Sequence, residues 1–268
     1  MAAACAITLV DAKGGKLKKP VRPSSWGMSA VATVVLPLLA AVAHTAAADA
    51  PKSVPDLSGV WEVTFGARSR PGPGMPEQPS LTTEYAQKLA AFKAAQAKGE
   101  EVESPQANCV PPGMPGIMNQ PYPMELLFTP GKVTIVIEAY SQTRRIFMDG
   151  RKHPDDPDLT YNGHSIGHWD GDTLVVDSVG FTPDTALGPS QGYRHSDQMH
   201  IVERLRLTAP DTMEVVTTID DAKALTKPIT ATKVLARHRD WDIAEYICEQ
   251  NNRNLSDEKG KAGIILTH

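Results

Sequence analysis

The sequence predicts a mainly β fold, in which a single antiparallel up-and-down β-barrel carries one surface helix and long proline-rich loops. Short segments rich in apolar residues recur through 124–249, separated by compact turns such as Thr129-Pro130-Gly131 and Asp170-Gly171. The 20 Gly and 22 Pro residues suit a protein with many turns better than a helical bundle. Closing such a meander into a barrel removes its exposed strand edges. A flat two-sheet sandwich is the alternative fold.

Residues 1–50 predict a secretory leader with a basic N-terminal extension. Five Lys and Arg residues precede an apolar run over 31–42, and a small-residue stretch follows and ends near Ala48. A transmembrane anchor is the alternative, but the apolar run is short for a bilayer and Pro37 interrupts it. We therefore expect residues 51–268 to form one barrel domain in the periplasm or outside the cell, with no membrane contact after cleavage.

The charge of the mature chain bears on its partners. Without the leader, 22 basic and 29 acidic side chains remain, a formal charge of −7. No basic cluster is left to neutralise phosphates, so nucleic acid is not an expected partner. We expect a small-molecule ligand or substrate instead.

The cysteines of the mature chain form an even pair. Cys109 and Cys248 are far apart in sequence, and an oxidising compartment favours one disulfide that ties an early loop to the last predicted strand. A catalytic thiol is the alternative. Neither cysteine lies in a Cys-x-x-Cys motif or beside an obvious base, so the disulfide is the simpler prediction.

The elements before the meander are one strand, one helix and a long loop. Segment 56–65 predicts the opening strand. Segment 81–98 predicts the helix, because Thr82 or Ser80 can cap it and its apolar residues recur at helical spacing. The proline-rich loop over 100–123 is long enough to suggest that it covers part of the barrel or carries function.

Nine further strands follow from the alternation of apolar residues and turns. They are predicted over 124–128, 132–140, 144–149, 163–170, 173–181, 198–208, 212–220, 230–237 and 244–249. With the opening strand they make about ten strands, each joined in order to the next.

Two resemblances extend this prediction. The Gly-x-Trp of Gly59-Val60-Trp61 resembles the entry of lipocalin-like barrels, where the indole closes one end. Several runs together resemble a widespread group of secreted bacterial proteins of unassigned function: Asn108-Cys109-Val110-Pro111-Pro112-Gly113, Asp149-Gly150-Arg151-Lys152-His153-Pro154, the hairpin Gly163 to Ser178, Thr218-Ile219-Asp220-Asp221 and Thr226-Lys227-Pro228. This second resemblance spans about residues 56–252 and implies no catalytic residues.

The hairpin over 163–178 carries side chains suited to chemistry. With a side-chain period of two, His164 and His168 share one face of the first strand. Asp177 lies in a mostly apolar row of the second strand, and Glu203 lies in an apolar row of segment 198–208. A carboxylate in such a row needs a partner or a raised pKa.

We expect Asp177 and Glu203 to face into the barrel, where burial would tune them as general acid and base. The alternative is a structural ion pair, in which Arg144, Arg145 or Arg204 neutralises either carboxylate. We also expect one histidine of the hairpin, and not both, to face the same pocket.

The expected function is a secreted, cofactor-independent enzyme, a lyase, isomerase or hydrolase that acts on a small, partly apolar or aromatic molecule by general acid-base catalysis. The catalytic candidates are His164, His195, Glu203 and Asp177, and the substrate-binding candidates are Tyr140, Arg144, Tyr161, His200 and His168. A lipocalin-like carrier of a small apolar ligand is one alternative, and a metal-dependent hydrolase that uses the histidines is another. Four residues of strand separate His164 from His168 by roughly 13 Å at ~3.3 Å per residue, which weakens the metal hypothesis.

Overall fold

The computed structural model describes residues 54–64, 79–98, 102–103, 108–187, 192–248 and 263–264. All of them belong to one unit of the chain, Asp49–His268. The predicted leader falls in the other unit, Met1–Ala48, and in the residues next to it, which lie outside the described residues. Within the described ranges, no helix is long and apolar enough to cross a bilayer.

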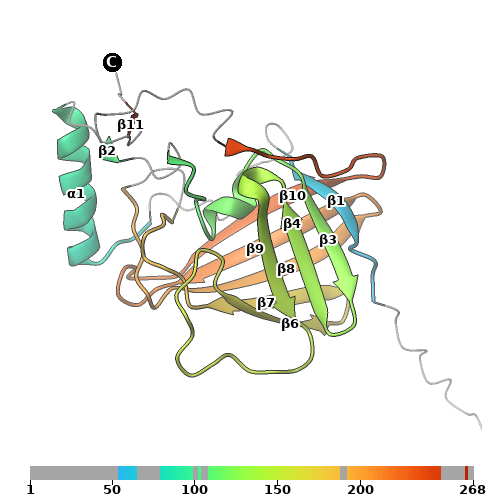
Figure 1. Cartoon of the computed structure of the whole chain (residues 1–268). Helices are drawn as coiled ribbons and strands as arrows, with labels where there is room; N and C mark the ends of the chain where they lie inside the picture. The colour runs from blue at the N-terminus through green and yellow to red at the C-terminus, as the bar shows by residue number, and fades with distance from the viewer. Residues whose placement is uncertain are drawn as a thin grey trace, which may run out of the picture. The chain divides into compact units, whose positions relative to one another are not determined.

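Nine strands close into a barrel, with β1 between β3 and β10 and the others following chain order (Figure 1). They are β1 (Gly59–Val63), β3 (Met124–Thr129), β4 (Lys132–Ile137), β5 (Gln142–Phe147), β6 (His164–Asp170), β7 (Thr173–Val179), β8 (His200–Ala209), β9 (Thr212–Asp220) and β10 (Ile229–His238). Pairing is antiparallel except between β5 and β6. The mainly β, mostly antiparallel closed barrel confirms the predicted fold class.

The remaining elements are short apart from one helix. Helix α1 (Thr83–Ala97) begins after Thr82. The Thr82 hydroxyl donates to the Lys223 carbonyl and accepts no hydrogen bond from a helix N–H, so the predicted side-chain cap does not form. Strands β2 (Val102–Glu103) and β11 (Gly263–Ile264) pair with each other, and 3-10 turns occupy Gly116–Asn119 and Ala139–Ser141. The helix agrees with the segment predicted over 81–98.

Segment 244–248 corrects the last predicted strand, because the structure places no strand there. Side-chain contacts hold this segment instead of a hydrogen-bonded ladder. Tyr246 packs against Tyr122 and Tyr140, with ring centroids 5.3 Å apart in both pairs. Alternating apolar residues at 244–248 therefore reflect packing on the barrel and not strand pairing.

The disulfide between Cys109 and Cys248 is confirmed. It ties segment 244–248 to the proline-rich loop, whose residues Met114 and Ile117 are fully buried. Met118 of the same loop reaches the barrel interior and lines its cavity. The loop therefore covers part of the barrel core, as its length predicted.

Trp61 is buried where β1 meets β3 and β10. Its indole Nε1 donates to the Leu57 carbonyl at 3.0 Å, and the Arg237 guanidinium lies 4.5 Å from its ring centroid. Arg237 also donates to the Asp56 carbonyl at 2.5 Å. These contacts fix the entry of the chain into the barrel.

The seam between β5 and β6 is the shortest pairing of the barrel. Only Ile146 with Ser165 and Phe147 with Ile166 are partners in this parallel ladder, since the chain crosses from β5 to β6 through the long segment 148–163. Most of the other neighbouring strands are joined by hairpin turns, which make antiparallel pairs. The sequence prediction assumed the same arrangement for β5 and β6 and therefore missed this parallel pair.

Gly167 permits the close approach at this seam. A Cβ on Gly167 would lie 2.8 Å from Cγ2 of Ile146 and 2.7 Å from Sδ of Met148. Gly163, at the start of the hairpin, has φ +65°, and a Cβ there would lie 2.6 Å from the ring of Phe181. Gly163 and Gly167 of the hairpin are therefore needed for close packing of the barrel.

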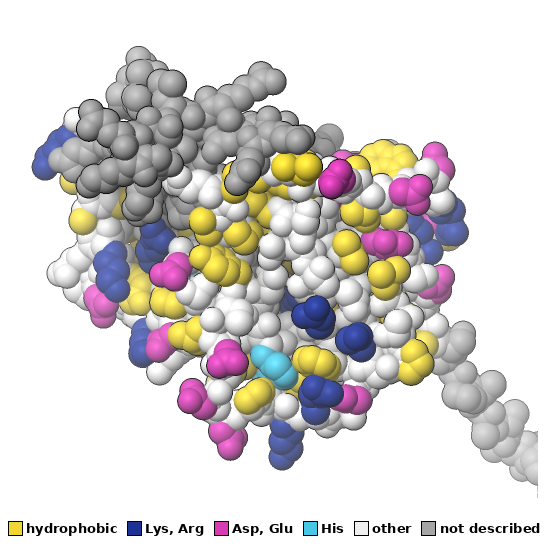
Figure 2. Space-filling view, viewed as in Figure 1, with side chains coloured by type: hydrophobic (Ala, Val, Ile, Leu, Met, Phe, Trp, Pro, Cys, Tyr) yellow, Lys and Arg dark blue, Asp and Glu magenta, His cyan; other side chains and the backbone are white. Residues whose placement is uncertain are grey.

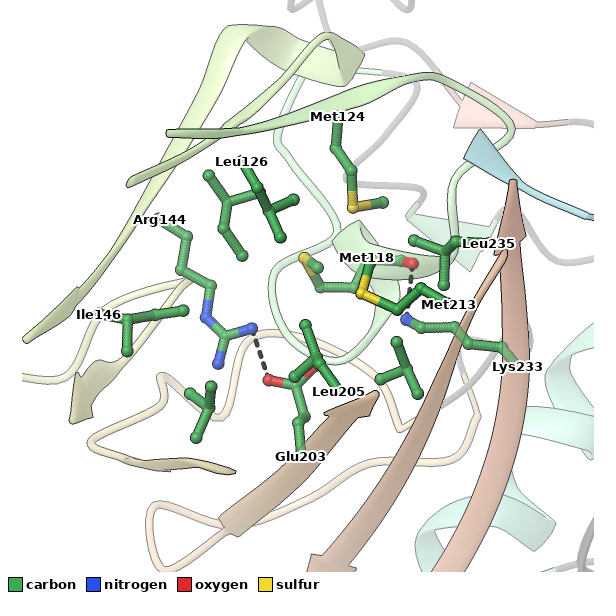
Figure 3. Close-up of a pocket in the computed structure, with 13 residues that line it drawn as sticks. Met118, Met124, Leu126, Arg144, Ile146, Glu203, Leu205, Met213, Lys233 and Leu235 are labelled. Carbon is green, nitrogen blue, oxygen red and sulfur yellow. Dashed lines mark hydrogen bonds and ion pairs between the residues drawn. The ribbon is translucent and has the colours of Figure 1, made fainter. Parts of the chain in front are cut away.

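Arg144 of β5 spans the seam inside the barrel. Its guanidinium forms an ion pair with Glu203 of β8 at 2.5 Å and donates to Ser178 of β7 at 2.9 Å and to Ser165 of β6 at 3.3 Å. Both charged side chains are almost fully buried, with 1% and 2% exposed. The structural alternative predicted for Glu203 is thus the arrangement observed (Figure 3).

The buried ion pair predicts a large effect of Glu203→Gln on stability. The substitution leaves the Arg144 charge buried without its counter-charge, so the free energy of unfolding should fall by about 3–5 kcal/mol. Replacing both residues by Met should recover most of this loss. Urea unfolding followed by Trp fluorescence measures both effects.

Asp170→Asn is the matched control, since it breaks an exposed ion pair with Arg204 and should leave the unfolding midpoint near that of wild type. Equal midpoints for Glu203→Gln and Asp170→Asn would contradict the role given to the buried pair.

The disulfide predicts a second stability effect. It closes a loop of 139 residues, so the double variant Cys109→Ser, Cys248→Ser should lose about 2–5 kcal/mol of unfolding free energy. Reduced wild type should match the variant in a thermal melt. An oxidised wild type no more stable than the variant would show that the bond does not constrain the chain.

Candidate functional site

The barrel interior is the predicted pocket, and the structure fills it. Figure 3 shows Arg144 and Glu203 pointing toward each other among apolar side chains. The space left measures about 10 Å³, roughly what one water molecule needs, and apolar atoms line it. Among the described residues, this cavity is too small for a drug-sized ligand in this conformation.

Lys233 of β10 is a third charged side chain at this cavity, and we did not predict it. Its ammonium donates to the Met118 carbonyl at 2.8 Å (Figure 3). It also donates to Asn119 Oδ1 at 3.1 Å. Burial lowers its pKa to about 8, which the charge of Glu203 only partly offsets. Strand alternation could have found it, because Lys233 shares a face with the inward Leu235.

Four polar side chains meet on the outer wall of the barrel. We call His153, His164, Asp177 and His200 the histidine cluster. His164 lies on β6, Asp177 on β7 and His200 on β8, and each points outward because the next residue along its strand is buried inside. His153 comes from the segment between β5 and β6.

The cluster is linked pairwise. Nδ1 of His153 lies 2.8 Å from Nδ1 of His164, and Nε2 of His153 lies 3.1 Å from Oδ1 of Asp177. Nε2 of His200 reaches the same Oδ1 at 2.8 Å. The side chains of His153, Asp177 and His200 are 20%, 38% and 41% exposed, so solvent and a small molecule can reach the cluster.

An aromatic ring supports His164 on one side. The Phe147 ring stacks on the imidazole with centroids 5.3 Å apart, and the Arg151 guanidinium lies 3.9 Å from the Phe147 centroid. Burial lowers the pKa of His164, and its electrostatic interactions with His153 and Arg151 lower it further. These effects favour the neutral form of the His164 imidazole.

Charges of both signs alternate on the surface. Figure 2 shows Lys and Arg side chains interspersed with Asp and Glu on the face in view, and one histidine side chain exposed near its lower margin. The local charge on this face is thus largely balanced.

The prediction that Asp177 faces into the barrel is wrong. The inward residues of β7 are Val176, which lines the cavity, and Ser178, which bonds to Arg144, so Asp177 lies on the opposite face. Residues on both faces of 173–176 are buried, and alternation alone could not tell the inner face from the outer. Among the described residues no histidine lines the barrel cavity, so the predicted inward histidine is corrected too.

Two predicted site residues of β8 lie on opposite sides of the barrel wall. His200 of β8 contacts Asp177 of β7, but on the outer wall, whereas Glu203 pairs with Arg144 inside. Three predicted site residues, His164, Asp177 and His200, therefore come together. Arg144 and Glu203 form a second group within the core.

His195 is buried in a loop, with 1% of its surface exposed. Its Nε2 lies 2.6 Å from the Thr185 hydroxyl and its Nδ1 lies 2.9 Å from the Ser196 carbonyl. Burial lowers its pKa. With both ring nitrogens engaged inside the protein, the imidazole is placed to stabilise the loop and not to meet a substrate.

The other predicted binding residues lie outside the cluster. His168 is exposed on β6. Burial raises the pKa of Tyr140 to about 12, and its backbone adopts φ 57°. Tyr161 accepts a hydrogen bond from the Met114 amide through its carbonyl. Within the part of the chain that the structure describes, these three side chains share no hydrogen bond or ion pair with the cluster.

His153 is the member that sequence analysis missed. It lies 11 residues before His164 in a polar loop with two prolines, and it is not among the site residues predicted from the sequence. No periodicity relates a loop residue to a strand face, so no sequence pattern pointed to this contact.

Metal coordination receives no support from this geometry. In residues 54–64, 79–98, 108–187 and 192–248, no group of three His, Cys, Asp or Glu side chains is arranged so that it could hold one metal ion. The cluster is a chain of pairwise hydrogen bonds, not a set of ligands around one point.

Comparisons with known proteins assign no family. No protein-family model matches the sequence, and no curated protein matches it. Among solved structures, the chain is similar to the crystal structure of a secretary abundant heat soluble (SAHS) protein from Ramazzottius varieornatus, with 11% identity, 68% of this chain and 95% of that chain covered, and a TM-score of 0.32. That score is too low to transfer a family or a function. The resemblance to secreted bacterial proteins therefore stays a prediction.

The burial of His195 predicts that the free energy of unfolding decreases at acid pH. Its pKa in the folded protein lies below its ordinary value of 6.5, so the unfolded chain binds more protons as the pH falls through that value. The free energy of unfolding should therefore decrease below pH 6.5, and the decrease should be smaller in His195→Gln. Urea unfolding at pH 7.5, 6.5 and 5.5 measures this, and equal slopes for both proteins would contradict it.

Proposed function

We propose that this protein is an enzyme that uses the histidine cluster for general acid-base catalysis on a small, partly apolar or aromatic molecule. The observation that carries the proposal is the continuous hydrogen-bonded chain from His164 through His153 and Asp177 to His200, part of which is open to solvent. Imidazoles titrate near neutral pH, and a neighbouring carboxylate orients them.

The surroundings of the cluster support this substrate class. Phe147 and Ile166 are cross-strand partners on the outer wall, and both are half-buried beside His164. They give an apolar surface next to groups that exchange protons, which suits a molecule with one apolar and one polar end. The reaction would be one in which proton transfer is the difficult step, as for a lyase, isomerase or hydrolase.

The proposed roles differ from those of the sequence prediction. His164 and Asp177 remain catalytic candidates and His200 remains a substrate-binding candidate, and His153 is added to the site. Arg144 and Glu203 take no catalytic role in this proposal, because they pair with each other in the buried interior. The disulfide supports the proposed location in an oxidising compartment, the periplasm or the cell exterior.

A carrier of a small apolar ligand is the second candidate. The closed barrel favours it, and the Met118, Met124 and Met213 side chains at the cavity are flexible enough to repack around a guest. The filled interior counts against it, because a ligand would have to displace these side chains.

A substrate screen tests the proposal. Wild type is incubated with aromatic ethers, esters and hydroxy-carbonyl compounds, and turnover is followed by chromatography. His164→Gln and Asp177→Asn should each lower kcat/KM by about 10²-fold or more, since each removes a proton-transfer group or its orienting partner.

His238→Gln is the control, a matched substitution of a histidine that contacts Trp241 and Glu62 instead of the cluster. It should leave turnover near wild type. Equal turnover in all four proteins would reject the cluster as the active site, and binding without turnover would favour the carrier.

A further inference from the structure

The hydrogen bonds of the histidine cluster have a direction. An ionised carboxylate only accepts hydrogen bonds, so both nitrogens that contact Oδ1 of Asp177 must carry protons. These are Nε2 of His153 and Nε2 of His200. The protonation of two imidazoles is therefore fixed by one carboxylate.

The position of the proton on His153 also determines which nitrogen of His164 is the hydrogen-bond donor. A neutral His153 with its proton on Nε2 has an unprotonated Nδ1, which can only accept. Nδ1 of His164 lies 2.8 Å from it and must be the donor. A neutral His164 that carries its proton on Nδ1 has a free lone pair on Nε2.

We infer that His153 is a positioning residue that selects this tautomer of His164, so that Nε2 of His164 is the atom that takes a proton from a neutral, weakly acidic substrate. The inference rests on the proposed function and deepens it. It assigns a role to His153, which the sequence did not predict, and it identifies Nε2 of His164 as the reacting atom of the site.

The proton step balances along the chain. The substrate X–H bond breaks and its electron pair stays on X, while a new N–H bond forms at Nε2 of His164. The proton on Nδ1 of His164 then moves to Nδ1 of His153 across the 2.8 Å contact. The positive charge ends on His153 beside Asp177. On the return step the proton on Nδ1 of His153 goes back to Nδ1 of His164, and the proton on Nε2 of His164 passes to the product.

Charge identifies the substrate class. In the state with Asp177 ionised and the imidazoles neutral, the cluster carries one negative charge. This repels an anionic substrate and accepts a neutral one. As the substrate becomes an anion, the cluster becomes neutral, because the imidazolium of His153 and the carboxylate of Asp177 form an ion pair. A phenol or a carbonyl compound with an acidic C–H bond fits this requirement.

The groups that face His164 favour its neutral form at rest. His153 meets its edge, Phe147 covers one face, and Arg151 lies beyond Phe147 with its charge paired to Asp149. Burial, His153 and Arg151 each lower the pKa of His164, and Asp177 reaches it only through His153. The imidazole is thus ready to accept a proton.

Nitrogen-15 NMR of histidine-labelled full-length protein at pH 8 tests the inference without a substrate. In wild type we expect His164 to be protonated at Nδ1 and bare at Nε2, and His153 to be protonated at Nε2. In His153→Phe, which keeps a ring but removes the acceptor, His164 should change to a mixture of tautomers. His238→Gln should leave the His164 signals unchanged.

A His164 protonated at Nε2 in wild type would overturn the inference, whether or not a substrate is turned over. The same Nδ1 tautomer in His153→Phe would also overturn it. With a substrate in hand, His153→Phe should lower kcat more than it raises KM and should shift the acid limb of the kcat/KM profile. The expected tautomers without any turnover would instead count against the proposed function and leave the tautomer assignment standing.

Discussion

The barrel interior is built around a buried ion pair, Arg144 with Glu203, neither of whose members can be lost alone without a large loss of stability. The ladder between β5 and β6 is parallel and short, so strand hydrogen bonds alone hold that seam weakly. The Arg144 guanidinium extends from β5 to side chains of β6, β7 and β8 and closes it from within. A buried charge pair of this kind contributes little net stability compared with apolar packing, but losing one partner is costly. The pair and the apolar side chains around it fill the interior, which leaves the outer wall for chemistry.

Strand alternation connects this core to the site. Ser165 and Ser178 point inward and bind Arg144, while their neighbours His164 and Asp177 point outward into the histidine cluster. On these two strands, adjacent residues therefore belong to different groups: one residue contacts Arg144 in the buried interior, and its neighbour belongs to the proposed catalytic cluster on the outer wall. Because the strands are held by the buried network, the outer side chains on them have a rigid support. Any change that shifts the register of β6 against β7 would disturb both networks.

The sequence predicted the barrel, the hairpin at Asp170-Gly171, the helix and the disulfide, because turn chemistry, side-chain period and cysteine count act locally. It also predicted that Glu203 faces inward and that an arginine could neutralise it. It could not assign the inner face of β7, since residues on both faces of that strand are buried and apolar. It could not place His153 either, because the crossover that brings this residue to His164 has no period. The parallel pairing of β5 and β6 was missed for the same reason, because the sequence of the connecting loop does not indicate whether the next strand runs parallel or antiparallel.

Chemistry on the outer wall requires that a substrate bind at the histidine cluster while the barrel interior stays packed. NMR of protein labelled at the Met methyl groups and the His rings, titrated with the best substrate from the screen, distinguishes the two locations. We expect shifts of the His153, His164 and His200 ring signals, with the methyl signals of Met118, Met124 and Met213 unchanged. Shifts of these Met signals without shifts of the three histidines would instead place the ligand inside the barrel and reject the outer wall as the site.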